Sequence, residues 1–205
     1  MIEVIDCPFA SEIKDDILAW ISTQKFDVIP FNALKTQNYN KIYIPEIKRL
    51  FDWIEDVVPD AVDRLARWTN SLYNSSRKGI EDIKRFKIDS YWSVAYPLQA
   101  YIGPHNHFPN SISFGYYVHT PENSSSFLYS DKCLEDILKD SSDCQEQPVK
   151  EGQLFLFNSS LMHWVAPPTT TCRTVPRTMI SGDLVYLSRF LEKEKSTFQI
   201  KDLIK

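Results

Sequence analysis

The sequence predicts a mainly β fold, a sandwich or barrel, that is buttressed by helices near its N-terminus. Apolar residues recur with the helical period in two stretches before residue 80. From Phe86 onward, short segments rich in β-branched and aromatic residues are separated by Pro, Gly, Asn and Ser, which is typical of a sandwich or barrel. A chain with helices first and strands afterwards favours a β-core covered by a helical layer.

The helical layer is expected to contain three segments. Over 11–25, four apolar residues share one helical face behind Ser11 as N-cap. A second apolar pattern starts at Pro45, is interrupted by Pro59 and resumes over 61–72. Because a proline inside a helix removes a hydrogen bond and clashes with the preceding turn, we expect two helices joined at a proline corner.

The strands are expected to form the rest of a single domain of residues 1–205, in which 1–80 is the helical buttress and 86–190 is the β-core. The polar stretch over 121–150 interrupts the strands and predicts a part-helical insertion, either a lid or binding loop or a surface excursion. The β-segments read "SISFGYYV", "SSFLYS", "GQLFLFN", "MHWVAP" and "RTMISGDLVYLSRF".

Charge and composition argue against several function classes. The net charge is −4, and basic and acidic residues are interspersed, so a nucleic acid is an unlikely partner. The four cysteines lack CxxC spacing, and the N-terminus lacks the pattern of a signal peptide. No stretch reaches the roughly 20 apolar residues that a membrane span requires. We therefore expect a cytoplasmic protein without a membrane partner.

Three of the four histidines form a candidate metal site. In "GPHNH", His105 and His107 stand two residues apart at the mouth of a predicted strand, where alternation directs both imidazoles to one face. His163 follows a predicted strand that turns through Asn158 and Ser159 and returns. In a sandwich these strand ends can be neighbours, and three ligands from one side leave other coordination positions open.

Imidazole suits iron, zinc and copper, and it binds a divalent cation without burying a negative charge. A closed structural site would show four ligands, often cysteines, and no cysteine here has such spacing. The alternative, three separate histidines at the surface or half-buried, is left open by spacing alone. The remaining histidine, His119, lies at the far end of its predicted strand and is expected in solvent.

The same segments resemble a known family. "HNHFPNSISFGYYVHTP", "EGQLFLFNSSLMHWVAPP" and "RTMISGDL" are similar to motifs of the small Fe(II)/2-oxoglutarate oxygenases of marine phages and bacteria, distant relatives of the prolyl 4-hydroxylases. The resemblance covers about residues 86–190. It implies a double-stranded β-helix core of the jelly-roll or cupin-like kind, with Fe(II) and the co-substrate 2-oxoglutarate.

The resemblance assigns the three histidines to the metal. His105 matches the opening ligand of the family's iron motif, and His163 matches the distal ligand. His107 stands where most 2-oxoglutarate oxygenases have Asp or Glu, a departure that the HxH subfamily shares. Such a site has one negative charge less than two histidines and a carboxylate.

The resemblance also implies a binding site for 2-oxoglutarate. Arg177 matches the residue that binds the distal carboxylate, for which a guanidinium is better suited than an ammonium. Ser181 lies on the same strand face, and Arg173 is the alternative arginine. Tyr116 matches the position from which prolyl-hydroxylase relatives hydrogen-bond 2-oxoglutarate. Gly182 and Asp183 stand where Phe-Asn is common.

The function implied is a dioxygenase that uses O2 and 2-oxoglutarate to hydroxylate a C–H bond of a peptidyl or small-molecule substrate, with succinate and CO2 as co-products. One alternative is a cupin-like dioxygenase with three histidines that does not use 2-oxoglutarate. Another is a non-catalytic jelly-roll binding module that grips a partner through the 121–150 insertion. Metal content and the effect of Arg177→Ala distinguish the three.

Overall fold

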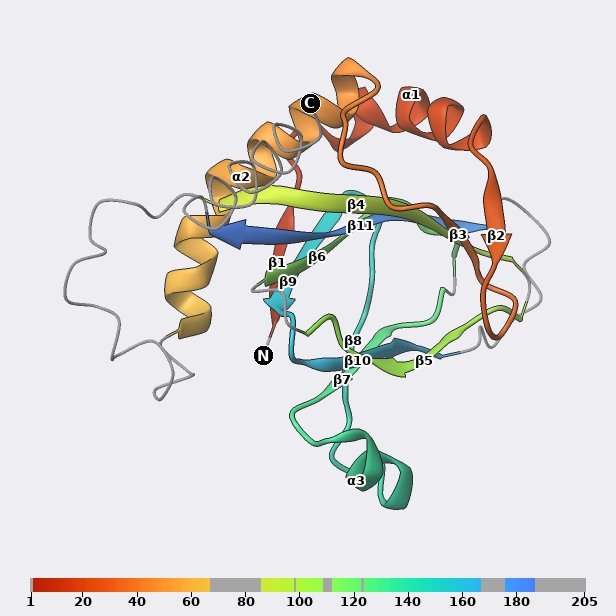
Figure 1. Ribbon diagram of the computed structural model, residues 1–205, viewed down its shortest axis with the longest axis vertical. Coiled ribbons are helices and arrows are strands. Elements are labelled where there is room, and N and C mark those ends of the chain that lie inside the picture. The colour runs from red at the N-terminus through yellow and green to blue at the C-terminus, as the bar shows by residue number, and fades with distance from the viewer. Residues whose placement is uncertain are drawn as a thin grey trace, which may run out of the picture.

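The computed structural model describes residues 2–66, 86–97, 99–108, 112–122, 124–166 and 176–186. Within these residues the chain is mainly β, as predicted, with two antiparallel sheets and three helices (Figure 1). The larger sheet has the order β1 (Ile2–Asp6), β9 (Gln153–Asn158), β6 (Ile112–His119), β11 (Arg177–Tyr186), β4 (Phe86–Tyr96), β3 (Leu34–Thr36) and β2 (Phe26–Val28). The smaller sheet has the order β5 (Ile102–His105), β10 (Met162–Val165), β7 (Phe127–Ser130) and β8 (Gln145–Gln147).

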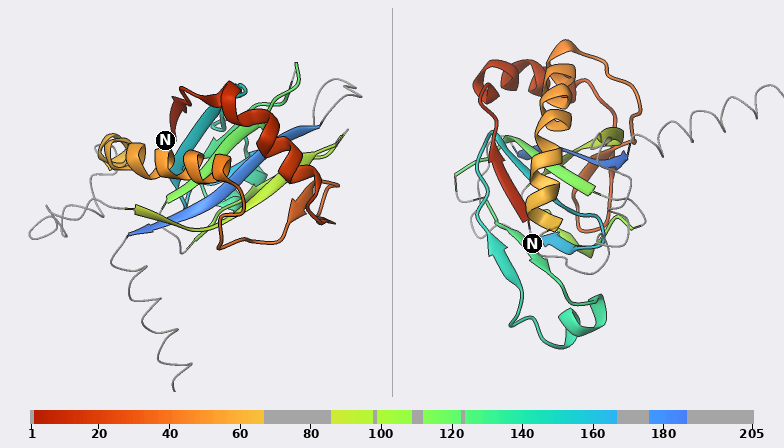
Figure 2. Two further views of the ribbon diagram at one scale, coloured as in Figure 1. Left: turned by 90° about the horizontal axis from the view of Figure 1, so that it is seen from above. Right: turned by 90° about the vertical axis from the view of Figure 1, so that its left-hand side faces the viewer.

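The molecule has three layers. Helices α1 (Ala10–Ser22) and α2 (Pro45–Ala66) cover the outer face of the larger sheet, and the smaller sheet faces its inner side (Figures 1 and 2). The short helix α3 (Leu134–Lys139) lies beyond the smaller sheet (Figure 1). The core is accordingly divided into one apolar cluster between the helices and the larger sheet and a second between the two sheets.

Strand alternation assigns neighbouring residues of the central strands to different layers. On β6, Phe114 and Tyr116 belong to the cluster under the helices, whereas Tyr117 belongs to the cluster between the sheets. Both faces of β6 are buried from Ile112 to Val118. Because both faces are covered, the strand lacks the apolar and polar alternation of a half-exposed strand.

Helix α2 differs from the predicted proline corner. The helix runs without interruption from Pro45 to Ala66 and contains Pro59. Val58 and Ala61, on either side of the proline, are both fully buried in the cluster under the helices. Packing of one continuous apolar face therefore outweighs the hydrogen bond that Pro59 cannot donate. The predicted continuation over residues 67–72 lies outside the described residues.

Two predicted boundaries also need correction. The region predicted as a helical buttress, 1–80, contains strands β1, β2 and β3 in its described part, and all three extend the larger sheet. The stretch predicted as an insertion, 121–150, contains α3 as expected, and it also contains β7, which the sequence predicts within "SSFLYS" and which pairs with β10 inside the smaller sheet. Strands β2 and β3 are three residues long, too short to give a clear periodic pattern.

Among the described helices, none combines the length and the apolar character needed to cross a membrane.

Candidate metal centre

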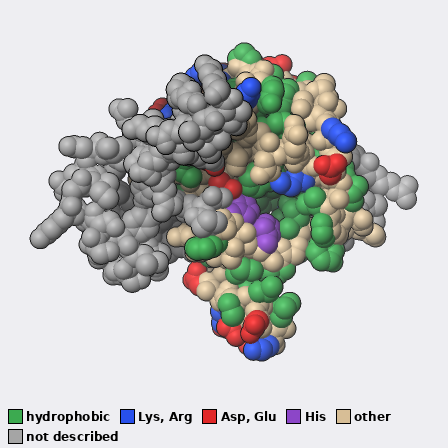
Figure 3. All heavy atoms as spheres, in the orientation of Figure 1, with side chains coloured by type: hydrophobic (Ala, Val, Ile, Leu, Met, Phe, Trp, Pro, Cys, Tyr) green, Lys and Arg blue, Asp and Glu red, His purple; other side chains and the backbone are tan. Residues whose placement is uncertain are grey.

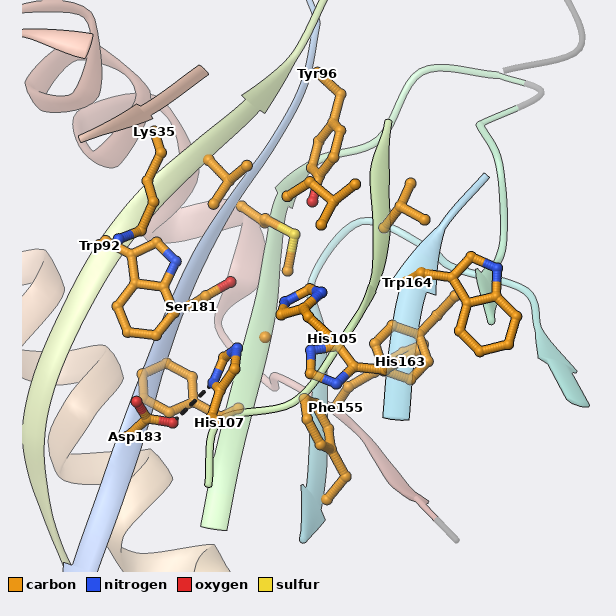
Figure 4. Close-up of a pocket in the computed structure, with 18 of the residues that line it drawn as sticks. Lys35, Trp92, Tyr96, His105, His107, Phe155, His163, Trp164, Ser181 and Asp183 are labelled. Atoms are coloured by element: carbon orange, nitrogen blue, oxygen red, sulfur yellow. Dashed lines mark hydrogen bonds and ion pairs between the residues drawn. The ribbon is translucent and has the colours of Figure 1, made fainter. Parts of the chain in front are cut away.

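The three predicted histidines meet between the two sheets. His105 ends β5 and lies directly opposite His163 of β10 in the ladder, so strand pairing brings these two together. His107 lies beyond the end of β5, where its backbone N–H donates to the carbonyl of Ser159 at 2.8 Å. One ring nitrogen from each histidine lies within 4.8 Å of the others, and the rings point toward one another (Figure 4).

Each imidazole is oriented by a hydrogen bond at Nδ1. His105 Nδ1 lies 2.9 Å from the carbonyl oxygen of Gly103, and His163 Nδ1 lies 3.0 Å from that of Leu161. His107 Nδ1 lies 3.0 Å from Oδ1 of Asp183. Carbonyl and carboxylate oxygens accept, so Nδ1 carries the hydrogen in each ring and the lone pair is left on Nε2. This donor set fits a divalent transition metal.

Burial keeps the two strand histidines neutral. Burial lowers the pKa of His163 well below its ordinary value, and the neighbouring imidazole of His105 adds to this shift. Burial also lowers the pKa of His105. An imidazole must be neutral to bind a metal, so these two rings are in the ligand form at neutral pH.

A buried acidic network behind His107 was not identified from the sequence. Asp183, on β11, is only 5% exposed, and its Oδ1 accepts hydrogen bonds from His107 Nδ1 and, at 2.7 Å, from Ser113 Oγ. Ser113 Oγ is also 2.8 Å from Ser159 Oγ. The only sequence signal was that Asp183 replaces a residue that is commonly Asn in the family that the chain resembles.

The histidines line a cavity of about 450 Å³ between the sheets. Aromatic rings form much of its wall, and the histidines are visible at a hollow in the surface, with acidic and basic side chains beside them (Figure 3). Lys35 lies on this wall, with its Nζ 4.7 Å from the centre of the Trp92 ring (Figure 4). Other described residues of the wall include Tyr96, Tyr117, Phe155, Phe157, Met179 and Ser181.

Arg177 lies next to one end of this cavity. Its side chain is 5% exposed, and the guanidinium stacks 4.3 Å from the ring centre of Tyr96, which is part of the wall. Nη1 donates to the carbonyl of Ser125 at 2.5 Å, whereas Nε has no hydrogen-bond partner among the described residues. The Tyr117 hydroxyl is also buried, with no hydrogen-bond partner in the part of the chain that the structure describes, and the charge of Arg177 acts on it. Unpaired buried donors are costly, so this end of the cavity fits an anionic ligand such as a carboxylate.

The predicted tyrosine needs correction. Tyr116 points away from the histidines into the layer under the helices, where its hydroxyl lies beside the Cys7 thiol. Its neighbour Tyr117 lines the cavity instead, because adjacent residues of a strand face opposite sides. Ser181 lies on the cavity wall as expected, and Arg173 lies outside the described residues.

His119 is also not where it was predicted. Its side chain is mostly covered rather than in open solvent, and its Nδ1 lies 3.1 Å from Oε2 of Glu151. The carboxylate of Glu151 also pairs with Lys14 of α1 at 2.8 Å. His119 therefore belongs to a polar contact around Glu151 that connects β6 with α1, apart from the metal centre.

No family model matches the chain, and no curated protein matches it. Solved structures are similar in fold. A prolyl-4-hydroxylase from Pseudomonas putida has a TM-score of 0.58 at 12% identity, covering 90% of this chain and 92% of that one. An oxidoreductase of the 2OG-Fe(II) oxygenase family from Burkholderia pseudomallei has a TM-score of 0.57 at 10% identity, covering 90% and 84%.

A third similar structure was solved with ligands. HygX from Streptomyces hygroscopicus, with nickel and 2-oxoglutarate bound, has a TM-score of 0.55 at 13% identity, covering 91% of this chain and 83% of that one. The fold is thus mainly β with a double-stranded β-helix core, as predicted, and it is the fold of 2-oxoglutarate oxygenases. On that fold this chain carries a cluster of three histidines.

Proposed function

We propose that the protein is an Fe(II)- and 2-oxoglutarate-dependent dioxygenase that hydroxylates a C–H bond of a peptidyl or small-molecule substrate. The observation that carries the proposal is the convergence of His105, His107 and His163, each with Nδ1 hydrogen-bonded, inside a cavity of the oxygenase fold. Fold likeness alone does not specify a reaction, so the proposal depends on this donor set.

The proposed roles follow from the chemistry of each group. The three imidazoles would hold Fe(II) and, because they approach from one side, leave coordination positions free toward the cavity. When bound, the metal and co-substrate supply the oxidising chemistry, in which O2, 2-oxoglutarate and a C–H bond yield succinate, CO2 and an alcohol. The aromatic walls of the cavity would exclude water from this reaction.

The co-substrate is assigned to the end of the cavity beside Arg177. The unpaired Nε of Arg177 and the unpaired hydroxyl of Tyr117 would donate to the distal carboxylate of 2-oxoglutarate. Ser181, also on the wall, is a further donor in reach of the cavity interior. Tyr117 thus takes the role that the sequence alone assigned to Tyr116.

The proposal extends to the biological setting. The "HNH" spacing supports membership of the HxH oxygenases of marine phages and bacteria, and a cytoplasmic location would keep iron in the ferrous state. With a net charge of −4, the chain offers little attraction to a nucleic acid backbone, so a peptidyl or small-molecule substrate is preferred.

An anaerobic titration tests this proposal. Metal-free protein is titrated with Fe(II) and then with 2-oxoglutarate, and the weak visible charge-transfer band of chelated 2-oxoglutarate is recorded. We expect a band that saturates at one equivalent of each. Iron binding without the band would contradict the use of 2-oxoglutarate and favour the cupin-like alternative. Absence of iron binding would contradict both enzyme assignments and favour a binding module.

A further inference from the structure

His107 occupies the position at which a carboxylate ligand is usual, yet a carboxylate lies directly behind it. Asp183 Oδ1 is 3.0 Å from His107 Nδ1, on the side of the ring opposite to the nitrogen that faces the other histidines (Figure 4). By contrast, the Nδ1 atoms of His105 and His163 lie against backbone carbonyls, which are neutral. The three imidazoles are therefore supported unequally.

The position of Asp183 is fixed by its neighbours. Ser113 Oγ donates to Asp183 Oδ1 at 2.7 Å and lies 3.1 Å from His107 Nδ1, and Ser159 Oγ is 2.8 Å from Ser113 Oγ. Both serines are fully buried. The backbone carbonyl of Ser159 also accepts a hydrogen bond from the backbone N–H of His107 at 2.8 Å, so Ser159 helps to hold both the backbone and the ring of His107. His107 lies beyond the end of β5, so these hydrogen bonds hold it in place where the pairing of strands does not.

The charge on Asp183 is directed at His107. Among the residues that the structure describes, Asp183 contacts His107 directly, and Lys35 acts on the carboxylate without a direct contact. A buried carboxylate is costly unless it is hydrogen-bonded and faces positive charge. A cation held by His107 would supply positive charge through the imidazole ring.

We propose that Asp183 is a positioning residue of the metal centre, which orients His107 and places behind it the negative charge that a carboxylate ligand would otherwise supply. The proposal rests on the proposed function of the three histidines as metal ligands. At a site of three neutral imidazoles, the two positive charges of Fe(II) and the two negative charges of 2-oxoglutarate sum to zero. With Asp183 the net charge is one negative charge, the same as for two histidines and one carboxylate. Carboxylates behind ligating histidines increase ligand basicity and fix the tautomer.

The test is metal affinity in metal-free protein, titrated anaerobically with Co(II), whose visible absorption reports its coordination. Asp183→Asn keeps an acceptor for Nδ1 but removes the charge, and we expect the Kd for Co(II) to rise about tenfold or more, within the range known for outer-shell partners. Asp183→Ala removes the acceptor as well and should raise it about a hundredfold. The 15N shifts of His107 in Zn(II)-loaded protein then show whether the Nδ1–H tautomer is retained.

The control is Glu55→Gln. Glu55 is a mostly buried carboxylate on α2 that pairs with Lys87 and accepts the backbone N–H of Ile88 at 3.2 Å, on the other side of the larger sheet. Removing its charge should leave the Kd for Co(II) within twofold of the wild type. A comparable loss of affinity in Glu55→Gln would indicate a general charge effect and overturn the proposal.

A second variant moves the carboxylate instead of removing it. In the double variant His107→Asp with Asp183→Asn, the charge passes from behind the ring to the ligand position. We expect its Kd for Co(II) to be at least tenfold lower than that of His107→Ala. If the double variant binds no better than His107→Ala, the charge is not what Asp183 contributes and the proposal is wrong.

The outcomes separate this proposal from the proposed function. If wild-type protein does not bind Co(II) or Fe(II), the metal centre itself is wrong. If wild-type protein binds and Asp183→Asn binds equally well, only the role of Asp183 is wrong. A lower melting temperature of metal-free Asp183→Asn with an unchanged Kd would show that Asp183 merely joins β11 to β6, and would also overturn the proposal.

Discussion

Tyr116 and Tyr117 are adjacent on β6, and comparing them contrasts the two faces of the larger sheet. Both side chains are buried, at 1% and 0% exposure. Burial raises the pKa of each hydroxyl, so both remain protonated. The hydroxyl of Tyr116 lies beside the Cys7 thiol under the helices, whereas that of Tyr117 has no hydrogen-bond partner among the described residues.

The two faces of the larger sheet differ in the kind of side chain that they bury. Under the helices, fully buried residues such as Ile54, Leu156 and Ile180 form an apolar contact that stabilises the fold. On the inner face, the cavity lies among His105, His107 and His163. Beside it, Arg177 Nε and the Tyr117 hydroxyl find no hydrogen-bond partner within the described ranges. Unpaired buried donors lower stability unless a ligand pairs with them, so the inner face costs the fold stability that a bound ligand would restore.

The largest expected effect is that of His163→Ala. Removal of one of three ligands should weaken Fe(II) binding more than a hundredfold, beyond the roughly 10–100-fold cost of outer-shell changes, and abolish 2-oxoglutarate turnover. The matched change on the other face is Leu156→Ala, which should cost about 2–5 kcal/mol of unfolding free energy and leave Fe(II) affinity unchanged. Anaerobic metal titration and denaturant unfolding measure the two effects. Retained turnover in His163→Ala would refute the metal assignment.

The next effect is that of Arg177→Ala. Loss of the guanidinium should weaken 2-oxoglutarate binding about a hundredfold, or about 3 kcal/mol, with Fe(II) affinity unchanged. Arg49 on the outer side is the control, because it also stacks on an aromatic ring, 4.1 Å from the centre of Phe9, and pairs with Glu12 at 2.7 Å. Arg49→Ala should not affect 2-oxoglutarate binding. Substrate oxidation that persists in Arg177→Ala would favour the cupin-like alternative.

The sequence predicts the inner face only in part. Strand alternation and spacing predict the β-core and direct His105 and His107 to one face, whereas the meeting of these two with His163 and the role of Arg177 and Ser181 are implied by the resemblance to the oxygenases. The alternation of side chains along a strand also predicts that only one of Tyr116 and Tyr117 can face the cavity. It does not predict which of the two tyrosines does so, because both faces of β6 are buried and no polar residue marks the outer face of the strand.

The remaining errors have tertiary causes. Pro59 signals a helix end locally, but the burial of Val58 and Ala61 against the sheet continues the helix. Asp183 is separated from His107 by 76 positions, so its contact depends on the pairing of β11 with β6. A single sequence contains no signal for that register, since many pairings of buried strands satisfy the same apolar pattern.

The smallest expected effects come from removing one hydroxyl from each tyrosine, and these two changes test the comparison most directly. Tyr117→Phe removes an unpaired buried hydroxyl, so the metal-free protein should be unchanged in stability or gain up to about 1 kcal/mol, while 2-oxoglutarate binds about tenfold more weakly. Tyr116→Phe removes a buried hydroxyl that lies beside the Cys7 thiol, and it should lower the free energy of unfolding by about 0.5–1.5 kcal/mol with no change in 2-oxoglutarate affinity. Denaturant unfolding and 2-oxoglutarate titration of the Fe(II)-loaded variants give all four values. The opposite pattern, with Tyr116→Phe weakening 2-oxoglutarate binding, would return the co-substrate role to Tyr116 and contradict the assignment of the faces.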